Sequence, residues 1–97
     1  MNAPSAQPTV QTDNESVRVT LWEFAPGAAT GAHRHEMDYV VVPVVSGRLR
    51  LVSDSGEESF ADLEAGRSYF RTRGVAHNVF NAGDAYMAFV EVELKGS

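Results

Sequence analysis

The three histidines of this chain are spaced so that one metal ion could use them all. His33 and His35 are two residues apart, and side chains two apart on a β-strand point to the same face. His77 lies on a later segment that a neighbouring strand could bring beside this pair. Imidazole nitrogen is a good ligand for first-row transition ions. Because the chain has no other histidine and no cysteine, we expect one transition-metal site, made by His33, His35 and His77.

The segments around the histidines have the two-residue hydrophobic period of β-strands. Apolar and polar side chains alternate over residues 17–24 and again over residues 86–94. Glycine, proline, serine and aspartate separate the segments and predict turns. No segment has a 3.6-residue period, so we predict an all-β sandwich or barrel of seven or eight strands, such as a double-sheet jelly roll. The other expected strands cover 38–45, 48–53, 58–63, 68–71 and 75–80, with a short extended segment over 30–35.

Residues 38–45 are β-branched and nearly all apolar. Apolar side chains on both faces are typical of a central strand that is covered on both sides. Pro43 interrupts this run and has no N–H to donate to a neighbouring strand. We therefore expect a β-bulge or an unpaired position at Pro43.

A chain of 97 residues is expected to fold as one domain. Residues 1–15 are rich in proline, serine, glutamine and threonine, which predicts a flexible N-terminal arm. An edge strand added in a dimer is the alternative for this stretch. Residues 16–97 are then the single β-barrel domain.

The charge balance excludes some classes of partner. The formal net charge is −5 and the sequence pI is about 5.0, whereas nucleic acids and anionic membrane surfaces require clustered Lys and Arg. No apolar run approaches the roughly 20 residues of a membrane-spanning helix. We expect a small-molecule partner, with no nucleic acid and no membrane. The absence of cysteine and of a secretory signal pattern favours a cytoplasmic protein.

Two motifs resemble those of the cupin superfamily. Gly66, Gly74, His77 and Asn81 have the spacing of the second cupin motif, with Thr72 at the position of its proline. The run 33–35, with Gly27 or Gly31 before it and Gly47 after it, resembles the first motif. Together these matches cover about residues 17–94 and imply a small cupin-type double-sheet jelly-roll barrel. The stretches 22–27, 33–36 and 38–43 are also similar to small single-domain cupins associated with β-alanine degradation.

One departure from the first cupin motif concerns its glutamate. That position falls on Tyr39 or Val40 in this chain, and neither is an ordinary anionic ligand. The resemblance therefore implies a three-histidine site, holding one divalent transition metal such as Fe, Zn, Ni or Mn. Whether Glu36 or Asp38 replaces the missing carboxylate stays open at this point.

A divalent ion held by three neutral imidazoles keeps its full charge and leaves positions open for water or substrate. Such a site favours an anionic or chelating molecule. Three-histidine cupins are similar in this respect to thiol and β-diketone dioxygenases. We therefore expect a mononuclear, dioxygenase-like enzyme that acts on a small acidic or dicarbonyl molecule. The alternative is a cupin module that binds a small ligand without catalysis.

Two further residues are candidates for substrate binding. Arg71 could anchor a substrate carboxylate through a bidentate contact, although a solvated or salt-bridged arginine is the alternative. Tyr39 could line the cavity or donate a hydrogen bond to a bound oxygen. A domain of this size has exposed sheet edges, which cupins commonly cover by pairing, so we expect a homodimer.

Overall fold

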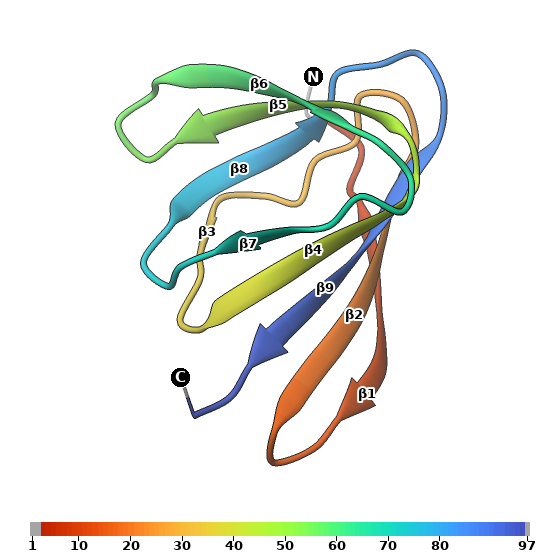
Figure 1. The fold of residues 1–97 in the computed structure, drawn as a ribbon. Helices are drawn as coiled ribbons and strands as arrows, with labels where there is room; N and C mark the ends of the chain where they lie inside the picture. Colours follow the sequence, from red (N-terminus) through yellow and green to blue (C-terminus); the bar gives the residue numbers. More distant parts are fainter. Residues whose placement is uncertain (1–2, 97) are drawn as a thin grey trace.

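Two antiparallel sheets, curved around each other, make up the computed structural model, which describes residues 3–96 (Figure 1). The first sheet has five strands in the order β1-β2-β9-β4-β7, and the second has four in the order β3-β8-β5-β6. The strands are β1 (Gln7–Asp13), β2 (Val17–Phe24), β3 (His33–Arg34), β4 (Asp38–Val45), β5 (Gly47–Ser53), β6 (Glu58–Leu63), β7 (Tyr69–Arg71), β8 (Ala76–Asn81) and β9 (Met87–Leu94).

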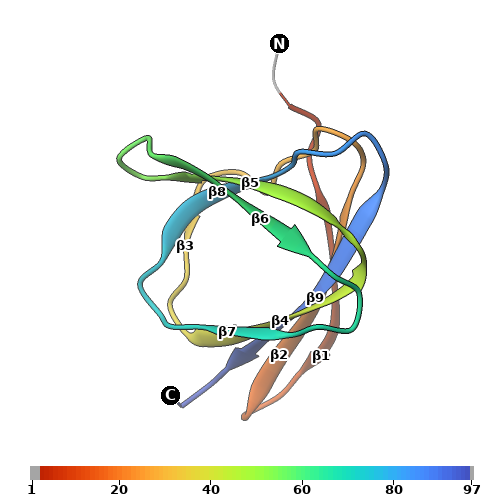
Figure 2. The same cartoon turned by 45° about the horizontal axis from the view of Figure 1, so that its top comes forward.

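The view in Figure 2 shows that strands of both sheets surround a common interior. This arrangement is the small double-sheet jelly-roll barrel that the sequence predicted. The expected strands are present, most of them within a residue or two of the predicted bounds. Among residues 3–96, no helix has the length and hydropathy needed to cross a membrane.

The core lies between the two sheets, where alternate residues of β2, β4 and β9 point inward. Phe24 on β2 and Phe89 on the adjacent strand β9 pack diagonally on the inner face of the first sheet, with ring centroids 5.4 Å apart. Leu49 reaches the same core from the second sheet, and Met87 fills it at the end where β4 passes into β5. Burying each of these large side chains contributes roughly 1.5–3 kcal/mol to folding. The strands that carry the histidines are therefore fixed to a rigid frame.

Two residues allow the chain to cross from one sheet to the other. The pairing of β4 with β9 shifts register between Pro43 and Val45, which confirms the expected bulge at Pro43. Gly47 follows at the start of β5, and a Cβ atom there would lie 2.9 Å from the Cβ of Met87. Glycine is required at this position because the backbone passes so close to the core.

The N-terminal stretch forms a strand that the sequence did not predict within the barrel. Residues of β1 pair antiparallel with β2 of the same chain, from Gln7 opposite Glu23 to Asp13 opposite Arg18. Every residue of β1 is exposed, so its sequence has no buried face and no hydrophobic period. The expected flexibility of residues 1–15 stays a prediction, but the described part of this stretch is paired with the first sheet.

Candidate metal centre

Two of the three histidines lie on adjacent strands of the second sheet, β3 and β8, and the third lies in the segment that follows β3. His33 on β3 is the direct cross-strand partner of His77 on β8. His35 lies just beyond β3, and its position is set by two backbone hydrogen bonds to the β7–β8 turn. Its N–H donates to the carbonyl of Val75 at 2.9 Å, and its carbonyl accepts from the N–H of Gly74 at 2.8 Å. Gly74 has a φ of 93°, a conformation that glycine adopts without strain.

The imidazole rings converge through their Nε2 atoms. The Nε2 of His35 lies 3.0 Å from that of His33 and 3.1 Å from that of His77. Two ligands about 2.1 Å from an ion lie about 3.0 Å apart when they subtend a right angle, and about 3.4 Å apart at a tetrahedral angle. The spacing therefore fits a first-row ion bound on one face by three histidines. The structure thus brings together the three histidines that the sequence analysis singled out.

The tautomer of His33 also suits metal binding. Its Nδ1 lies 2.8 Å from the carbonyl oxygen of Gly31, and a carbonyl only accepts hydrogen bonds. His33 therefore carries its proton on Nδ1, which leaves the Nε2 lone pair available for an ion. The hydroxyl of Thr30 lies 3.3 Å from the same nitrogen. A hydrogen bond of this kind at the distal nitrogen is the usual way to orient a ligating histidine.

The other two histidines are kept neutral by their surroundings. Burial, with a smaller contribution from His33, lowers the pKa of His35 to about 4. Burial is also the main reason that the pKa of His77 is lowered to about 4, with further contributions from His33, His35 and Arg71. Both rings therefore offer unprotonated nitrogen at neutral pH, as a transition ion requires.

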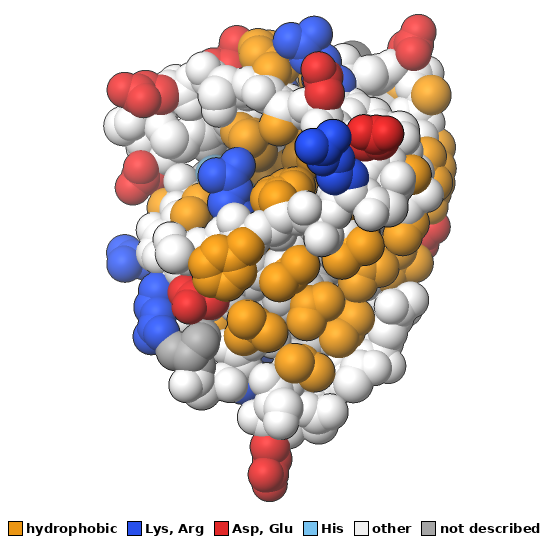
Figure 3. Space-filling view, in the orientation of Figure 1, with side chains coloured by type: hydrophobic (Ala, Val, Ile, Leu, Met, Phe, Trp, Pro, Cys, Tyr) orange, Lys and Arg blue, Asp and Glu red, His pale blue; other side chains and the backbone are white. Residues whose placement is uncertain are grey.

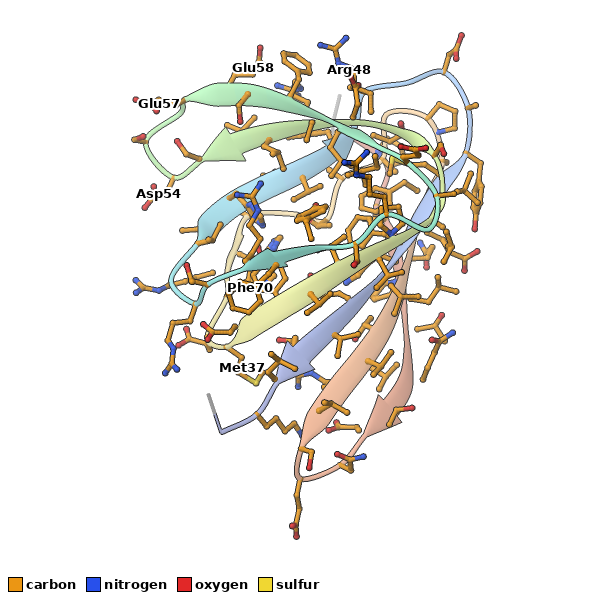
Figure 4. The ribbon with its side chains drawn as sticks, viewed as in Figure 1. Met37, Arg48, Asp54, Glu57, Glu58 and Phe70 are labelled. Carbon is orange, nitrogen blue, oxygen red and sulfur yellow. The ribbon has the colours of Figure 1, made fainter. Side chains whose placement is uncertain are left out.

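A cavity of about 280 Å³ opens beside the histidines, inside the barrel. This volume is at or just below the lower end of the range for small-molecule sites, so only a small molecule fits. Aromatic and aliphatic side chains from both sheets form much of its wall, including Trp22, Tyr69, Leu51 and Phe89. Glu57 in the β5–β6 turn and Glu58 at the start of β6 also line the cavity (Figure 4).

Both predicted substrate-binding residues line this cavity. Tyr39 is buried and its ring stacks on that of His35, with centroids 4.0 Å apart and planes 21° from parallel. Burial is the main reason that the pKa of the Tyr39 phenol is raised to about 12, so this hydroxyl remains a donor. Arg71 is exposed, and its guanidinium lies 5.3 Å from the ring centroid of Tyr69.

The carboxylates near His35 in the sequence are not at the centre. Asp38 accepts a hydrogen bond from the backbone N–H of Arg73 at 2.8 Å, and the Arg73 Nε lies 3.7 Å from the same oxygen. Glu36 is exposed. Within the described part of the chain, neither belongs to a cluster of three side chains that could hold an ion. The structure therefore supplies no support for Glu36 or Asp38 as the missing ligand.

A different carboxylate, from β9, is the functional candidate that sequence reasoning missed. Glu91 is only 8% exposed and lines the cavity. Burial raises its pKa to about 7, and the nearby Glu93 adds to this effect, while Arg18 and the indole of Trp22 oppose it. The signal was present in the alternation of β9, which places Glu91 on the same face as the core residues Met87 and Phe89.

The asparagine of the second motif serves the fold. Its Nδ2 donates to the backbone carbonyls of Phe24, Ala25 and Ala85, and its Oδ1 accepts from the N–H of Gly83. Asn81 therefore joins the ends of β2, β8 and β9, away from the cavity.

Comparison with known proteins agrees with this fold. The family model described as Cupin domain matches residues 20–93. The chain is 55% identical over 92 residues to the "Beta-alanine degradation protein BauB" of Pseudomonas aeruginosa, a match that covers 95% of this chain and 96% of that protein. A cupin domain from Bordetella pertussis is 52% identical, with a TM-score of 0.94 and 99% of each chain covered. A double-stranded β-helix protein from Klebsiella pneumoniae shares the fold, with a TM-score of 0.77 at 22% identity over 96% of this chain and 79% of that one.

Proposed function

The chain belongs to the cupin family, and we propose that His33, His35 and His77 hold one divalent transition-metal ion in it. The observation that carries this proposal is the convergence of three Nε2 atoms, two pairs of them 3.0 and 3.1 Å apart. Three neutral nitrogens suit Fe, Zn, Ni or Mn without selecting among them. When bound, such an ion would supply Lewis-acid chemistry and, if it is iron, redox chemistry at its open positions.

We propose that the site takes a small acidic or dicarbonyl molecule. The cavity of about 280 Å³ limits its size, and the charge of an ion bound by neutral ligands favours an anion. Arg71 is proposed to hold a carboxylate at the cavity wall, and the Tyr39 hydroxyl to donate a hydrogen bond to a second oxygen. Arg71 is suited to this role because, within the described residues, it is in no salt bridge.

The reaction that we propose is oxygen-dependent cleavage of this molecule, in the manner of a mononuclear dioxygenase. Glu91 and Tyr39 provide a carboxylate and a phenol beside the histidines, so the cavity contains groups that could hold or move a proton. The relative from Pseudomonas aeruginosa is named for β-alanine degradation. β-Alanine is a small acid, and its deaminated products are carbonyl acids, which agrees with the proposed substrate class.

The test begins with elemental analysis of protein purified without added metal, followed by loading with Fe²⁺ under argon. We expect about one ion per chain, and oxygen uptake when a 3-oxo acid or a 1,3-diketone is added. Loss of uptake in His77→Ala, with Arg34→Ala as the control, would link turnover to the centre. If the protein binds one of these compounds tightly but takes up no oxygen with Fe, Zn, Ni or Mn loaded in turn, the non-catalytic alternative is correct.

We also propose that the protein is a homodimer. The outward face of the first sheet is apolar across three central strands, and these side chains stay partly exposed: Val19, Leu21, Val40, Val42, Val90 and Val92. Phe70 on β7 continues this face and is 54% exposed. Figure 3 shows hydrophobic side chains gathered over this side of the molecule. A second copy would cover this face with its own, as two-fold symmetric interfaces require. Val92→Lys should convert the dimer to a monomer in light scattering.

A further inference from the structure

Behind the histidine cluster, on the side of the first sheet, two buried carboxylates face His35. Glu91 and Glu93 lie two residues apart on β9 and therefore point to the same side. One nitrogen of His35 and one oxygen of each glutamate lie within 4.8 Å of one another. The Nε2 of His35 points to the other two histidines. Its Nδ1 is therefore the nitrogen that a carboxylate can orient without competing with an ion.

The two glutamates differ in how they are held. Glu93 forms a salt bridge with Arg18, whose Nε donates to Oε1 at 2.9 Å and whose Nη2 donates to Oε2 at 3.3 Å. Glu91 forms no salt bridge within residues 3–96, and the indole of Trp22 is its hydrogen-bonding neighbour. Glu91 also lines the cavity, which Glu93 does not. Glu91 is therefore the carboxylate available to His35.

We propose that Glu91 is a positioning residue for the metal centre, where it orients His35 by accepting the proton of its Nδ1 through one bridging water molecule. The inference rests on the proposed metal site. It gives this site an orienting carboxylate from β9, whereas Glu36 and Asp38 near the His-x-His segment lie away from the centre. A separation of up to 4.8 Å is one that a bridging water spans. Burying a carboxylate is costly unless it has hydrogen-bonding partners, and His35 would add a second one to the indole of Trp22.

His33 and His35 would then be oriented in different ways. The Gly31 carbonyl fixes the proton of His33 on Nδ1. Stacking on Tyr39 restrains the plane of the His35 ring, but stacking does not decide which nitrogen carries the proton. Glu91 would hold the proton of His35 on Nδ1 and would also raise the basicity of the Nε2 atom. Losing Glu91 should therefore change the tautomer of His35 and leave that of His33 unchanged.

The first experiment uses the metal-free protein and needs no activity. Long-range ¹H–¹⁵N correlation spectra at pH 7.5 report the tautomer of each histidine. We expect His35 to be protonated on Nδ1 in the wild type and to become a mixture of tautomers in Glu91→Met, while His33 keeps its shifts. Glu57→Met, which makes the same change on another wall of the cavity, should leave both rings unchanged. Unchanged His35 shifts in Glu91→Met would overturn the proposal, as would equal changes in His33 and His35.

The second experiment measures affinity for Zn²⁺ by competition with a chromophoric chelator. Loss of an outer partner of a ligating histidine typically weakens metal binding by about 10- to 100-fold. We expect a loss of this size in Glu91→Met, a smaller one in Glu91→Gln because the amide oxygen still accepts, and less than about threefold in Glu57→Met. If Glu91→Met does not fold, Glu91→Gln replaces it: a neutral amide oxygen is a weaker acceptor than a carboxylate, so part of the His35 population should move to the other tautomer, and unchanged His35 shifts would overturn the proposal. If the wild type binds no Zn²⁺, the proposed metal site is wrong, while the tautomer spectra still test whether Glu91 orients His35.

Discussion

The ring of Tyr39 lies over the ring of His35, with centroids 4.0 Å apart and planes 21° from parallel. Tyr39 is on β4 and is buried, whereas His35 belongs to the segment after β3. The contact therefore joins His35, a candidate metal ligand next to the second sheet, to β4 of the first sheet. An aromatic pair of this kind contributes about 0.5–1.5 kcal/mol.

This stack leads to a prediction about two substitutions of Tyr39. Tyr39→Phe keeps the ring and should change Zn²⁺ affinity by less than about twofold. Tyr39→Leu removes the stack and should weaken binding by about 2- to 10-fold, which corresponds to the energy of the pair. Isothermal titration calorimetry separates the two outcomes. Equal losses in both variants would show that the hydroxyl, and not the ring, supports His35.

Removal of one histidine should abolish tight metal binding. His77→Ala leaves two nitrogens, and we expect the dissociation constant for Zn²⁺ to rise by at least about 100-fold, more than for loss of an outer partner. Arg34→Ala is the matched control, because Arg34 lies between two of the ligands but is exposed. The same affinity in His77→Ala and Arg34→Ala would show that the ion binds elsewhere.

The raised pKa of Glu91 predicts a distinctive dependence of stability on pH. Folding raises this pKa from 4.5 to about 7, so the folded state holds a proton that the unfolded state loses. The contribution to stability is greatest below pH 4.5 and is lost as the pH rises to about 7. In Glu91→Gln this dependence is absent. The melting temperature of the variant, relative to wild type, should therefore be higher at pH 8 than at pH 5.

His35 and His77 act in the opposite sense on the metal-free protein. Their pKa values fall from 6.5 to about 4 on folding, so stability decreases as the pH drops from about 6.5 to 4. Both groups are present in wild type and in Glu91→Gln, and burial is the main cause of both shifts, so the difference between the two proteins reports mainly on Glu91. Melting curves of chelator-treated protein by circular dichroism provide the measurement. If the difference in melting temperature between wild type and Glu91→Gln is the same at pH 5 and pH 8, the raised pKa assigned to Glu91 is wrong.

Arg71 should contribute to binding of a small acid and Arg73 should not. A charge-assisted hydrogen bond is typically worth about 1.5–3 kcal/mol, so Arg71→Ala should weaken binding of a carboxylate ligand by about 10-fold or more. Arg73 is paired with Asp38 outside the cavity, and Arg73→Ala should change affinity by less than about threefold. Binding of the acid to the metal-loaded protein can be followed by calorimetry. Equal losses would indicate general electrostatic attraction instead of a specific anchor.

Much of this architecture could be predicted from local patterns. Strand alternation predicted that His33 and His35 point to the same face. The bulge at Pro43 followed from its missing N–H. The cupin motif also singled out Gly74, whose N–H the structure shows bonded to the carbonyl of His35. The bulge and the shared face of His33 and His35 depend on geometry within a few residues, whereas the place of His77 beside them followed from the cupin resemblance.

Other features depend on contacts that the sequence does not reveal. Strand β1 has only exposed residues, so no hydrophobic period marked it, and its pairing with β2 is set by the edge of the completed sheet. Glu91 was placed on the face of Met87 and Phe89, but its burial beside His35 depends on how the two sheets curve together. For the same reason, the pairing of Asp38 with Arg73 could not be anticipated.

Anomalous diffraction from crystals of protein purified without added metal would test the central claim most directly. The account predicts a single anomalous peak about 2.0–2.2 Å from the Nε2 atoms of His33, His35 and His77, and the absorption edge would identify the element. A peak bound by other residues, or imidazole rings that stay unliganded in crystals soaked with each of Fe²⁺, Zn²⁺, Ni²⁺ and Mn²⁺, would contradict it.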